Sequence, residues 1–232
     1  MSSDTAICFD KVSKVFSKGH NQHGTLREGI MSFFSGKDKP GPLKDNQFFA
    51  IKNLSFLVQK GQSIGLYGPN GSGKSTLLKL VANVIAPTRG KVGVTGRIAP
   101  LIELGAGFHP DLNGLENIYM NGAILGMTIG EIKSKTDQII EYSGLSDFIS
   151  TPVKKYSSGM NLRLGFSIAI HSDADIYLID EILAVGDEEF KIKSFNSIKD
   201  LLEQNKTLLI VSHSMERLSQ LTDKIIFLKK QD

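Results

Sequence analysis

The sequence predicts an α/β fold built on a mostly parallel, doubly wound sheet. Short apolar segments alternate with helical segments along most of the 232-residue chain, and this alternation is typical of strands joined by crossover helices. Two of the apolar segments, residues 176–180 (IYLID) and 207–213 (TLLIVSH), begin with uninterrupted apolar runs, as parallel strands covered on both faces do. The length fits one large domain, and a hydrophobic content of 41% is enough for an ordinary packed core.

The first 100 residues predict several strands and one insertion. Residues 6–16 alternate between apolar and polar side chains and predict an edge strand. Residues 17–48 are rich in Gly, Lys, His, Asp and Pro, and we interpret them as an insertion between two strands. Residues 48–68 then predict two more strands, residues 77–85 predict a helix, and residues 86–99 predict a turn followed by short strands.

The rest of the chain is mainly helical until its last strands. Residues 113–150 have a helical pattern that Gly122, Gly126 and Gly144 are expected to break. Further helices are expected at residues 162–171 and 189–205, and strands are expected at residues 176–180, 207–213 and 223–230.

Composition and charge exclude several classes of protein. A net charge of +3 gives no support for nucleic-acid binding. The single cysteine, Cys8, rules out an internal disulfide and suits a reducing compartment. No apolar run approaches the roughly 20 residues that span a bilayer, and the N-terminal residues lack the basic start and apolar core of a secretion signal. We therefore expect a soluble cytosolic protein.

The turn GPNGSGKST follows a predicted strand and precedes a predicted helix. Its spacing fits the phosphate-binding pattern G-x-x-x-x-G-K-[ST], because glycines let backbone N–H groups converge on phosphate oxygens and the helix N-terminus attracts the same charge. Lys74 is expected to pair with the β- and γ-phosphates and Ser75 to offer its hydroxyl to Mg²⁺. The alternative, a glycine turn with a surface lysine, fits the flanking strand and helix less well. The residues expected to contact the nucleotide here are Gly68, Pro69, Asn70, Gly71, Ser72, Gly73, Lys74, Ser75 and Thr76.

Two acidic residues at the end of a buried strand complete the predicted metal site. Asp180 ends the apolar run IYLID and Glu181 follows it directly, so the two side chains point in different directions. We expect Asp180 to hold Mg²⁺ through water and Glu181 to act as general base on the attacking water. Taken alone, the pair could equally be two solvent-facing acids at a strand end.

Three further motifs give the chain its resemblance to a known family. They are YSSGM at residues 156–160, LAVGD ending at Asp187, and LLIVSHS, which places His213 at the end of a strand. With the phosphate loop and IYLIDE, they make the chain resemble the ATP-binding cassette (ABC) family over nearly its whole length. The resemblance implies a P-loop NTPase whose RecA-like core carries an antiparallel β subdomain and a helical subdomain. It implies one ABC ATPase domain over residues 1–232, with the helical subdomain at about 113–171, and an ATPase that uses ATP and Mg²⁺.

The resemblance also implies roles for residues outside the phosphate loop. YSSGM occupies the place of the family signature, usually LSGGQ, and its Ser157, Ser158 and Gly159 would meet the phosphate bound to the other subunit. Two cassettes would then form a head-to-tail homodimer with two ATP sites. Asp187 lies where the family has its D-loop, and His213 matches the switch histidine, which would contact the γ-phosphate.

Two further positions follow from the resemblance. The family carries a glutamine that helps to bind the metal, but the segment from residue 98 to residue 118 has none. Glu103 is the nearest side chain with a suitable oxygen and is assigned this metal role, although Leu104 lies at the ungapped position. Phe16 is the candidate for stacking on adenine, and a core phenylalanine is the alternative.

The departures from the common motifs resemble one branch of the family, the cassettes that export polysaccharides such as O-antigen, capsule or wall teichoic acid. This implies export of a lipid-linked polysaccharide, with O-antigen as the preferred substrate, together with an integral membrane permease. It also implies a peripheral location on the cytoplasmic face of the inner membrane. The alternatives are a soluble ABC ATPase that acts on DNA or ribosomes and a small-molecule kinase.

The insertion contains one apolar island, TLREGIMSFFSG, that predicts a short helix. Thr25 and Glu28 fit a capping box, and Gly36 is placed to end the helix. Its apolar side, formed by Leu26, Ile30, Phe33 and Phe34, must pack on something, because about three turns are unstable alone. We expect this helix to lie either on its own sheet or beside the permease.

Overall fold

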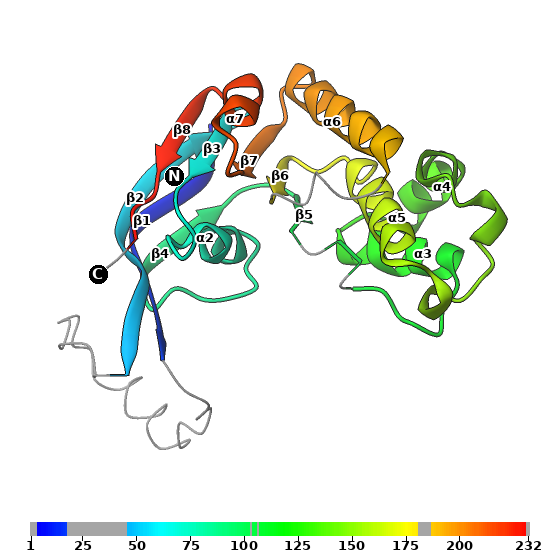
Figure 1. Cartoon of the computed structure of the whole chain (residues 1–232), viewed down its shortest axis with the longest axis horizontal. Helices are drawn as coiled ribbons and strands as arrows, with labels where there is room; N and C mark the ends of the chain where they lie inside the picture. The colour runs from blue at the N-terminus through cyan, green and yellow to red at the C-terminus, as the bar shows by residue number, and fades with distance from the viewer. Residues whose placement is uncertain (1–3, 18–45, 103, 106, 181–186, 231–232) are drawn as a thin grey trace.

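The fold is seen in a computed structural model that describes residues 4–17, 46–102, 104–105, 107–180 and 187–230 (Figure 1). A five-stranded sheet lies at its centre, with the strand order β5-β6-β7-β3-β8. All neighbouring strands in it are parallel. The strands are β3 (Ser63–Tyr67), β5 (Ile98–Leu101), β6 (Ile176–Ile179), β7 (Thr207–Val211) and β8 (Lys224–Phe227). The predicted parallel sheet is confirmed.

Both faces of the parallel sheet are covered. Every residue of β6 and β7 is buried. Tyr177 and Ile179 belong to one hydrophobic cluster, whereas Ile176 and Leu178 belong to another on the opposite face. This alternation is the period-2 pattern of a strand and explains why the sequence of β6 is apolar at each position.

A second, antiparallel sheet packs against the helix that follows the phosphate-binding turn. It consists of β1 (Thr5–Ser17), β2 (Gln47–Gln59) and β4 (Arg89–Val94), in the order β2-β1-β4. Its buried side chains share a core with α2 (Lys74–Val81) and with β3. The prediction of an edge strand at residues 6–16 is wrong, because β1 pairs with β2 on one side and with β4 on the other.

The helices α3 (Gly114–Ile124), α4 (Ile129–Ser143) and α5 (Ser158–Ile170) pack against one another at the end of the molecule away from β8 (Figure 1). Gly126 and Gly144 lie after α3 and α4, as expected. The prediction that Gly122 breaks the helix is wrong, because it lies inside α3. A Cβ at this position would stand 2.9 Å from the Cγ1 atom of Ile132. Glycine at this position permits close contact between α3 and α4.

The remaining elements connect these layers. The short 3-10 turns η1 (Ser146–Phe148) and η2 (Val153–Lys155) lead into α5, and α6 (Glu188–Glu203) precedes β7. The helix α7 (Met215–Leu221) packs on β3 and was not predicted from the sequence. Among the described residues, no helix has the length and apolar character needed to cross a membrane.

Candidate nucleotide site

The turn between β3 and α2 needs glycine at several positions. Gly71 and Gly73 have φ values of 80° and 93°, a region that side chains with a Cβ disfavour. A Cβ at Gly73 would also collide with the carbonyl oxygen of Ala50, and one at Gly68 would collide with that of Leu228. The loop is therefore packed tightly on β2 and on the residue after β8, which fixes its shape.

The N-terminus of α2 carries no protein cap among the described residues. Gly73 occupies the cap position without a side-chain hydrogen bond, and the first turn contains no acidic residue. The first N–H groups of a helix lack partners within the helix and carry a partial positive charge. This end of α2 can therefore bind an anion.

Lys74 spans the loop. Its side chain is 7% exposed, and its Nζ atom donates hydrogen bonds to the carbonyl oxygens of Gly68 at 2.7 Å and Pro69 at 3.0 Å. The ammonium group thus lies on the concave side of the turn, where the charge of a phosphate would be balanced.

Three predicted site residues from distant parts of the sequence meet here. A pocket of about 350 Å³ is lined by Ser75, Asp180 and His213, together with Asn70, Gly71, Gly73, Lys74, Thr76 and Val211. Asp180 follows β6 and His213 lies two residues after β7. In the sheet, β7 lies between β6 and β3. The carboxyl ends of the parallel strands therefore meet at one edge of the sheet, where ligands bind in open α/β folds.

Ser75 and Asp180 offer the oxygen ligands that Mg²⁺ prefers. Among the described residues there is no cluster of three or more His, Cys, Asp or Glu side chains that could hold a metal ion. A Mg²⁺ ion here would need ligands from phosphate and water as well, which is how this ion is usually bound beside nucleotides. The donor atoms of the pocket fit such a site.

Two predicted site residues cannot be placed. Glu181, the expected general base, and Glu103, the expected metal ligand, both lie outside the described residues. Their roles stay predictions.

The signature segment is anchored by Tyr156. The ring of this residue is buried, and its hydroxyl donates a 2.8 Å hydrogen bond to the carbonyl oxygen of Phe148. Burial raises the pKa of Tyr156. Ser157 then caps α5 by accepting a hydrogen bond from the N–H of Met160 at 3.2 Å, as a serine before a helix often does.

The signature residues and the phosphate loop are not brought together within one chain. Ser157 and Ser158 are exposed and Gly159 is half-buried at the start of α5. None of the described residues that line the Lys74 pocket belongs to this segment. The same is true of Asp187, which is exposed and caps α6 by accepting a 2.8 Å hydrogen bond from the N–H of Phe190.

Phe16 lies on β1, outside the pocket. It is 37% exposed, and its ring centroid is 6.1 Å from that of Phe48, its partner on β2. Ala50, two residues further along β2, is the residue that Gly73 contacts. The role of Phe16 in stacking on adenine stays a prediction.

The sequence did not reveal that a buried asparagine, Asn117, organises the segment HPDLNGLEN at the start of α3. Asn117 is fully buried. Its side chain accepts from the N–H of His109 and donates to the carbonyl oxygens of His109, Leu112 and Asn113. Asn113 and Glu116 form a capping box. The spacing N-x-x-E could have predicted that box.

Comparison with known proteins identifies the family. The model of the family described as "ABC transporter" matches residues 51–184. The chain belongs to the ABC transporter family. Within it, this cassette is an ATP-hydrolysing subunit, and its parallel sheet, antiparallel sheet and helices form the ABC nucleotide-binding fold.

Its relatives include several export proteins. The cassette is 42% identical over 223 residues to an "O-antigen export system ATP-binding protein RfbB" of Klebsiella pneumoniae, covering 96% of the chain and 89% of the relative. It is 44% identical over 213 residues to a protein of the same name from Myxococcus xanthus, covering 90% of the chain but only 48% of the relative. A "Teichoic acids export ATP-binding protein TagH" of Lactococcus lactis is 44% identical over 184 residues, which are 79% of the chain and 39% of the relative.

Solved structures support the fold. A dimer of the ATP-binding cassette MJ0796 bound to ADP and Pi has a TM-score of 0.73 and 20% identity over 97% of this chain and 94% of that one. A second dimeric structure of the same cassette gives the same TM-score at 21% identity and the same coverage.

Proposed function

We propose that this cassette powers the export of a lipid-linked polysaccharide, with O-antigen as the substrate, across the inner membrane. The observation that carries the proposal is the 42% identity to an O-antigen export ATP-binding protein over nearly the full length of both chains. The names of the relatives favour export over the alternative of a soluble ABC ATPase acting on DNA or ribosomes.

The pocket around Lys74 is the proposed ATP site. The N–H groups of the loop and of α2 bind the phosphates, and Lys74 balances their charge. Ser75 and Asp180 hold Mg²⁺, which neutralises charge on the phosphate oxygens when it is bound. His213 contacts the γ-phosphate, and Glu181, outside the described residues, takes the proton of the attacking water.

We propose that two copies of the chain form the working unit. The support is the separation within one chain of Ser157 and Asp187 from the pocket that Lys74 lines. A hydroxyl at the N-terminus of α5 can bind a phosphate, and in a head-to-tail dimer it would close the pocket of the partner subunit.

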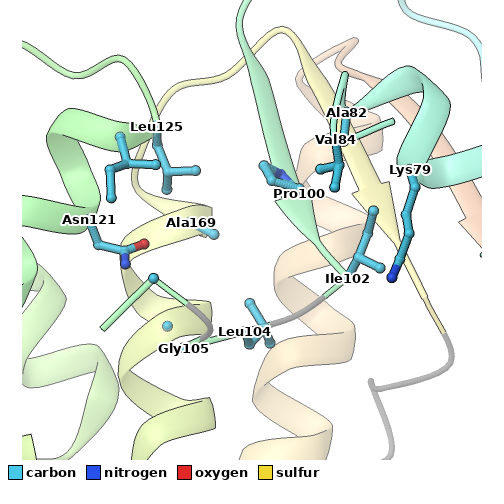
Figure 2. Close-up of a pocket in the computed structure, with 13 residues that line it drawn as sticks. Lys79, Ala82, Val84, Pro100, Ile102, Leu104, Gly105, Asn121, Leu125 and Ala169 are labelled. Carbon is cyan, nitrogen blue, oxygen red and sulfur yellow. The ribbon is translucent and has the colours of Figure 1, made fainter. Parts of the chain in front are cut away.

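The proposed permease contact is an apolar pocket at the edge strand β5, lined by residues of α2, α3 and α5 as well. Its volume is about 190 Å³. Figure 2 shows Pro100, Ile102 and Lys79 on one side of it and Asn121 and Leu125 on the other. Its remaining lining residues are Ala82, Val84, Leu104, Gly105, Gly107, Ile124, Gly165 and Ala169.

Two of these lining residues favour a partner with an apolar surface. Val84 and Ile124 line the pocket and are each 66% exposed. Apolar residues gathered at a concave surface are typical of an interaction site. We propose that apolar side chains of a cytoplasmic helix of the membrane permease enter this pocket. That contact would hold the cassette peripherally at the cytoplasmic face of the inner membrane.

The dimeric ATP site is tested by mixing two inactive variants. Lys74→Ala damages the phosphate loop, and Ser157→Arg damages the signature. Each purified variant alone should hydrolyse almost no ATP in the presence of Mg²⁺. In an equal mixture, half of the dimers are mixed and each has one intact site, so about a quarter of the wild-type rate should return. No recovery, or full activity of Ser157→Arg alone, would contradict the proposed dimer.

A further inference from the structure

Arg163 connects three separate elements. It lies in α5, six residues after Ser157. Its Nε atom donates a 2.8 Å hydrogen bond to the carbonyl oxygen of Ser143 at the end of α4. One terminal nitrogen donates to the Oδ2 atom of Asp187 at 3.3 Å, and the guanidinium lies 5.5 Å from the ring centroid of Phe190 in α6.

Asp187 uses its two carboxylate oxygens for different purposes. Its Oδ1 atom caps α6 by accepting from the N–H of Phe190, while its Oδ2 atom accepts from Arg163. A single carboxylate therefore both caps α6 and forms the ion pair with α5. Figure 1 shows this end of α6 beside α5.

Aromatic contacts reinforce the same junction. The rings of Phe166 in α5 and Phe190 in α6 meet edge to face with centroids 5.7 Å apart. Tyr142 of α4 contacts both rings at about 6 Å. Such pairs add modestly to the energy of apolar burial. The junction therefore has a packed apolar side and one charged link.

Gly144 leaves the space that Arg163 occupies. It follows α4 with a φ of 64°, and a Cβ there would collide with a terminal nitrogen of Arg163. The backbone beyond α4 is thus shaped around this guanidinium.

We propose that Arg163 is a positioning residue that holds the signature end of α5 and the Asp187 segment as one unit. This inference rests on the proposed function, in which Ser157 and Asp187 both act across the dimer interface. If the two segments moved independently, one could reach the partner subunit while the other did not. Misplacement of reacting groups by about 1 Å can slow catalysis by as much as about 100-fold.

Arginine is required because it makes both polar links at once. Its planar fork offers donors in two directions, whereas the lysine ammonium behaves as a point charge on a flexible stem. The side chains of Arg163 and Asp187 are 28% and 59% exposed, and exposed ion pairs contribute little to stability. The pair should therefore affect the reaction more than the folded state.

The test measures kcat and KM for ATP hydrolysis by the purified chain. Arg163→Ala should lower kcat about tenfold and leave KM within about twofold, because the phosphate loop is untouched. Asp187→Asn keeps the helix cap, since asparagine caps well, but removes the charge. In that background, adding Arg163→Ala should lower kcat by no more than about twofold, because linked residues are not additive.

Lys135→Ala is the matched control. Lys135 pairs with Asp173 and donates to the carbonyl oxygen of His171, so it joins α4 to the end of α5 without involving Asp187. Its side chain is 22% exposed, close to the value for Arg163. It should lower the thermal midpoint as much as Arg163→Ala does while keeping kcat. If Arg163→Ala does not fold, Arg163→Lys is measured in its place. Its kcat should lie between that of the wild type and the value expected for Arg163→Ala.

The outcomes separate this inference from the proposed function. Ser157→Arg is measured in the same assay. If it retains wild-type activity, the dimeric site and this inference both fall. If Ser157→Arg is inactive, the role of Arg163 alone is overturned by either of two results. One is that Arg163→Ala keeps kcat, as Lys135→Ala does. The other is that the losses of kcat caused by Arg163→Ala and Asp187→Asn multiply in the double variant.

Discussion

The polar side chains of the Lys74 pocket come from the ends of three neighbouring strands. Lys74 and Ser75 follow β3, Asp180 follows β6 and His213 follows β7. Their convergence could be predicted from the sequence because each motif lies at the end of an apolar run, and parallel strands end at the same edge of a sheet.

Other single residues could not be predicted in the same way. Tyr156 bonds to the backbone of Phe148, and Arg163 bonds to Ser143 and to Asp187. These contacts depend on how helices pack, so neither spacing nor composition reveals them. The sequence could show only that Tyr156 replaces the usual leucine of the signature.

Glu181→Gln tests the proposed general base. Glutamine keeps the size of the side chain but cannot take a proton from water, so hydrolysis should slow by at least about 100-fold. ATP binding should persist, because Lys74 and the loop remain. Lys74→Ala should weaken ATP binding itself. A Glu181→Gln variant that turned over at the wild-type rate in a steady-state phosphate-release assay would show that another group is the base.

At the scale of elements, the position of a strand along the chain was easier to predict than the strands that it pairs with. The strands β2, β3, β6 and β7 follow from their apolar runs. The central place of β1 does not, because a strand's second neighbour is not encoded in its own pattern. The short helix α7 has only seven residues, too few for its periodicity to be recognised.

Asn117→Ala tests the buried amide that organises the segment before α3. The substitution would leave the N–H of His109 without its partner and would remove one of the hydrogen bonds that the carbonyl oxygens of His109, Leu112 and Asn113 accept. The free energy of unfolding should therefore fall by about 3 kcal/mol. Denaturant titration measures the loss. Thr128→Ala, which removes only the cap of α4, should cost about 1 kcal/mol. Equal losses for the two variants would show that the amide network adds nothing beyond a cap.

The insertion helix predicted at residues 25–36 lies outside the described residues and stays a prediction. Replacing Ile30 and Phe33 with serine removes its apolar side. If the helix lies beside the permease, ATP hydrolysis by the purified cassette should remain unchanged while glycan export in cells falls. Loss of solubility or of basal hydrolysis would show instead that the helix packs on its own sheet.

At the scale of the whole molecule, the fold class was predictable and its division into parts less so. The alternation of strands and helices predicts the parallel sheet, whereas the antiparallel sheet was implied only by resemblance to the ABC family. The single domain over residues 1–232, with a helical subdomain at about 113–171, stays a prediction. The helices α3, α4 and α5 do pack together within that range.

ATP should drive dimerisation most visibly when hydrolysis is blocked. Binding and association are linked if each signature completes the site of the partner. We therefore expect the Glu181→Gln variant to sediment as a dimer with ATP and Mg²⁺ and as a monomer without nucleotide. Adding Ser157→Arg to that variant should abolish the shift. A shift that survived Ser157→Arg would mean that the dimer uses a different surface.

The central claim is that ATP hydrolysis by this chain powers export of O-antigen. It is tested most directly by deleting the gene in its own cells and restoring either the wild-type chain or the Glu181→Gln variant, with surface O-antigen as the measurement. We predict that the deletion removes O-antigen from the surface and that its lipid-linked form accumulates inside. The wild-type chain should restore export and Glu181→Gln should not, although both are produced in equal amounts. Normal surface O-antigen in the deletion strain, or rescue by Glu181→Gln, would contradict the claim.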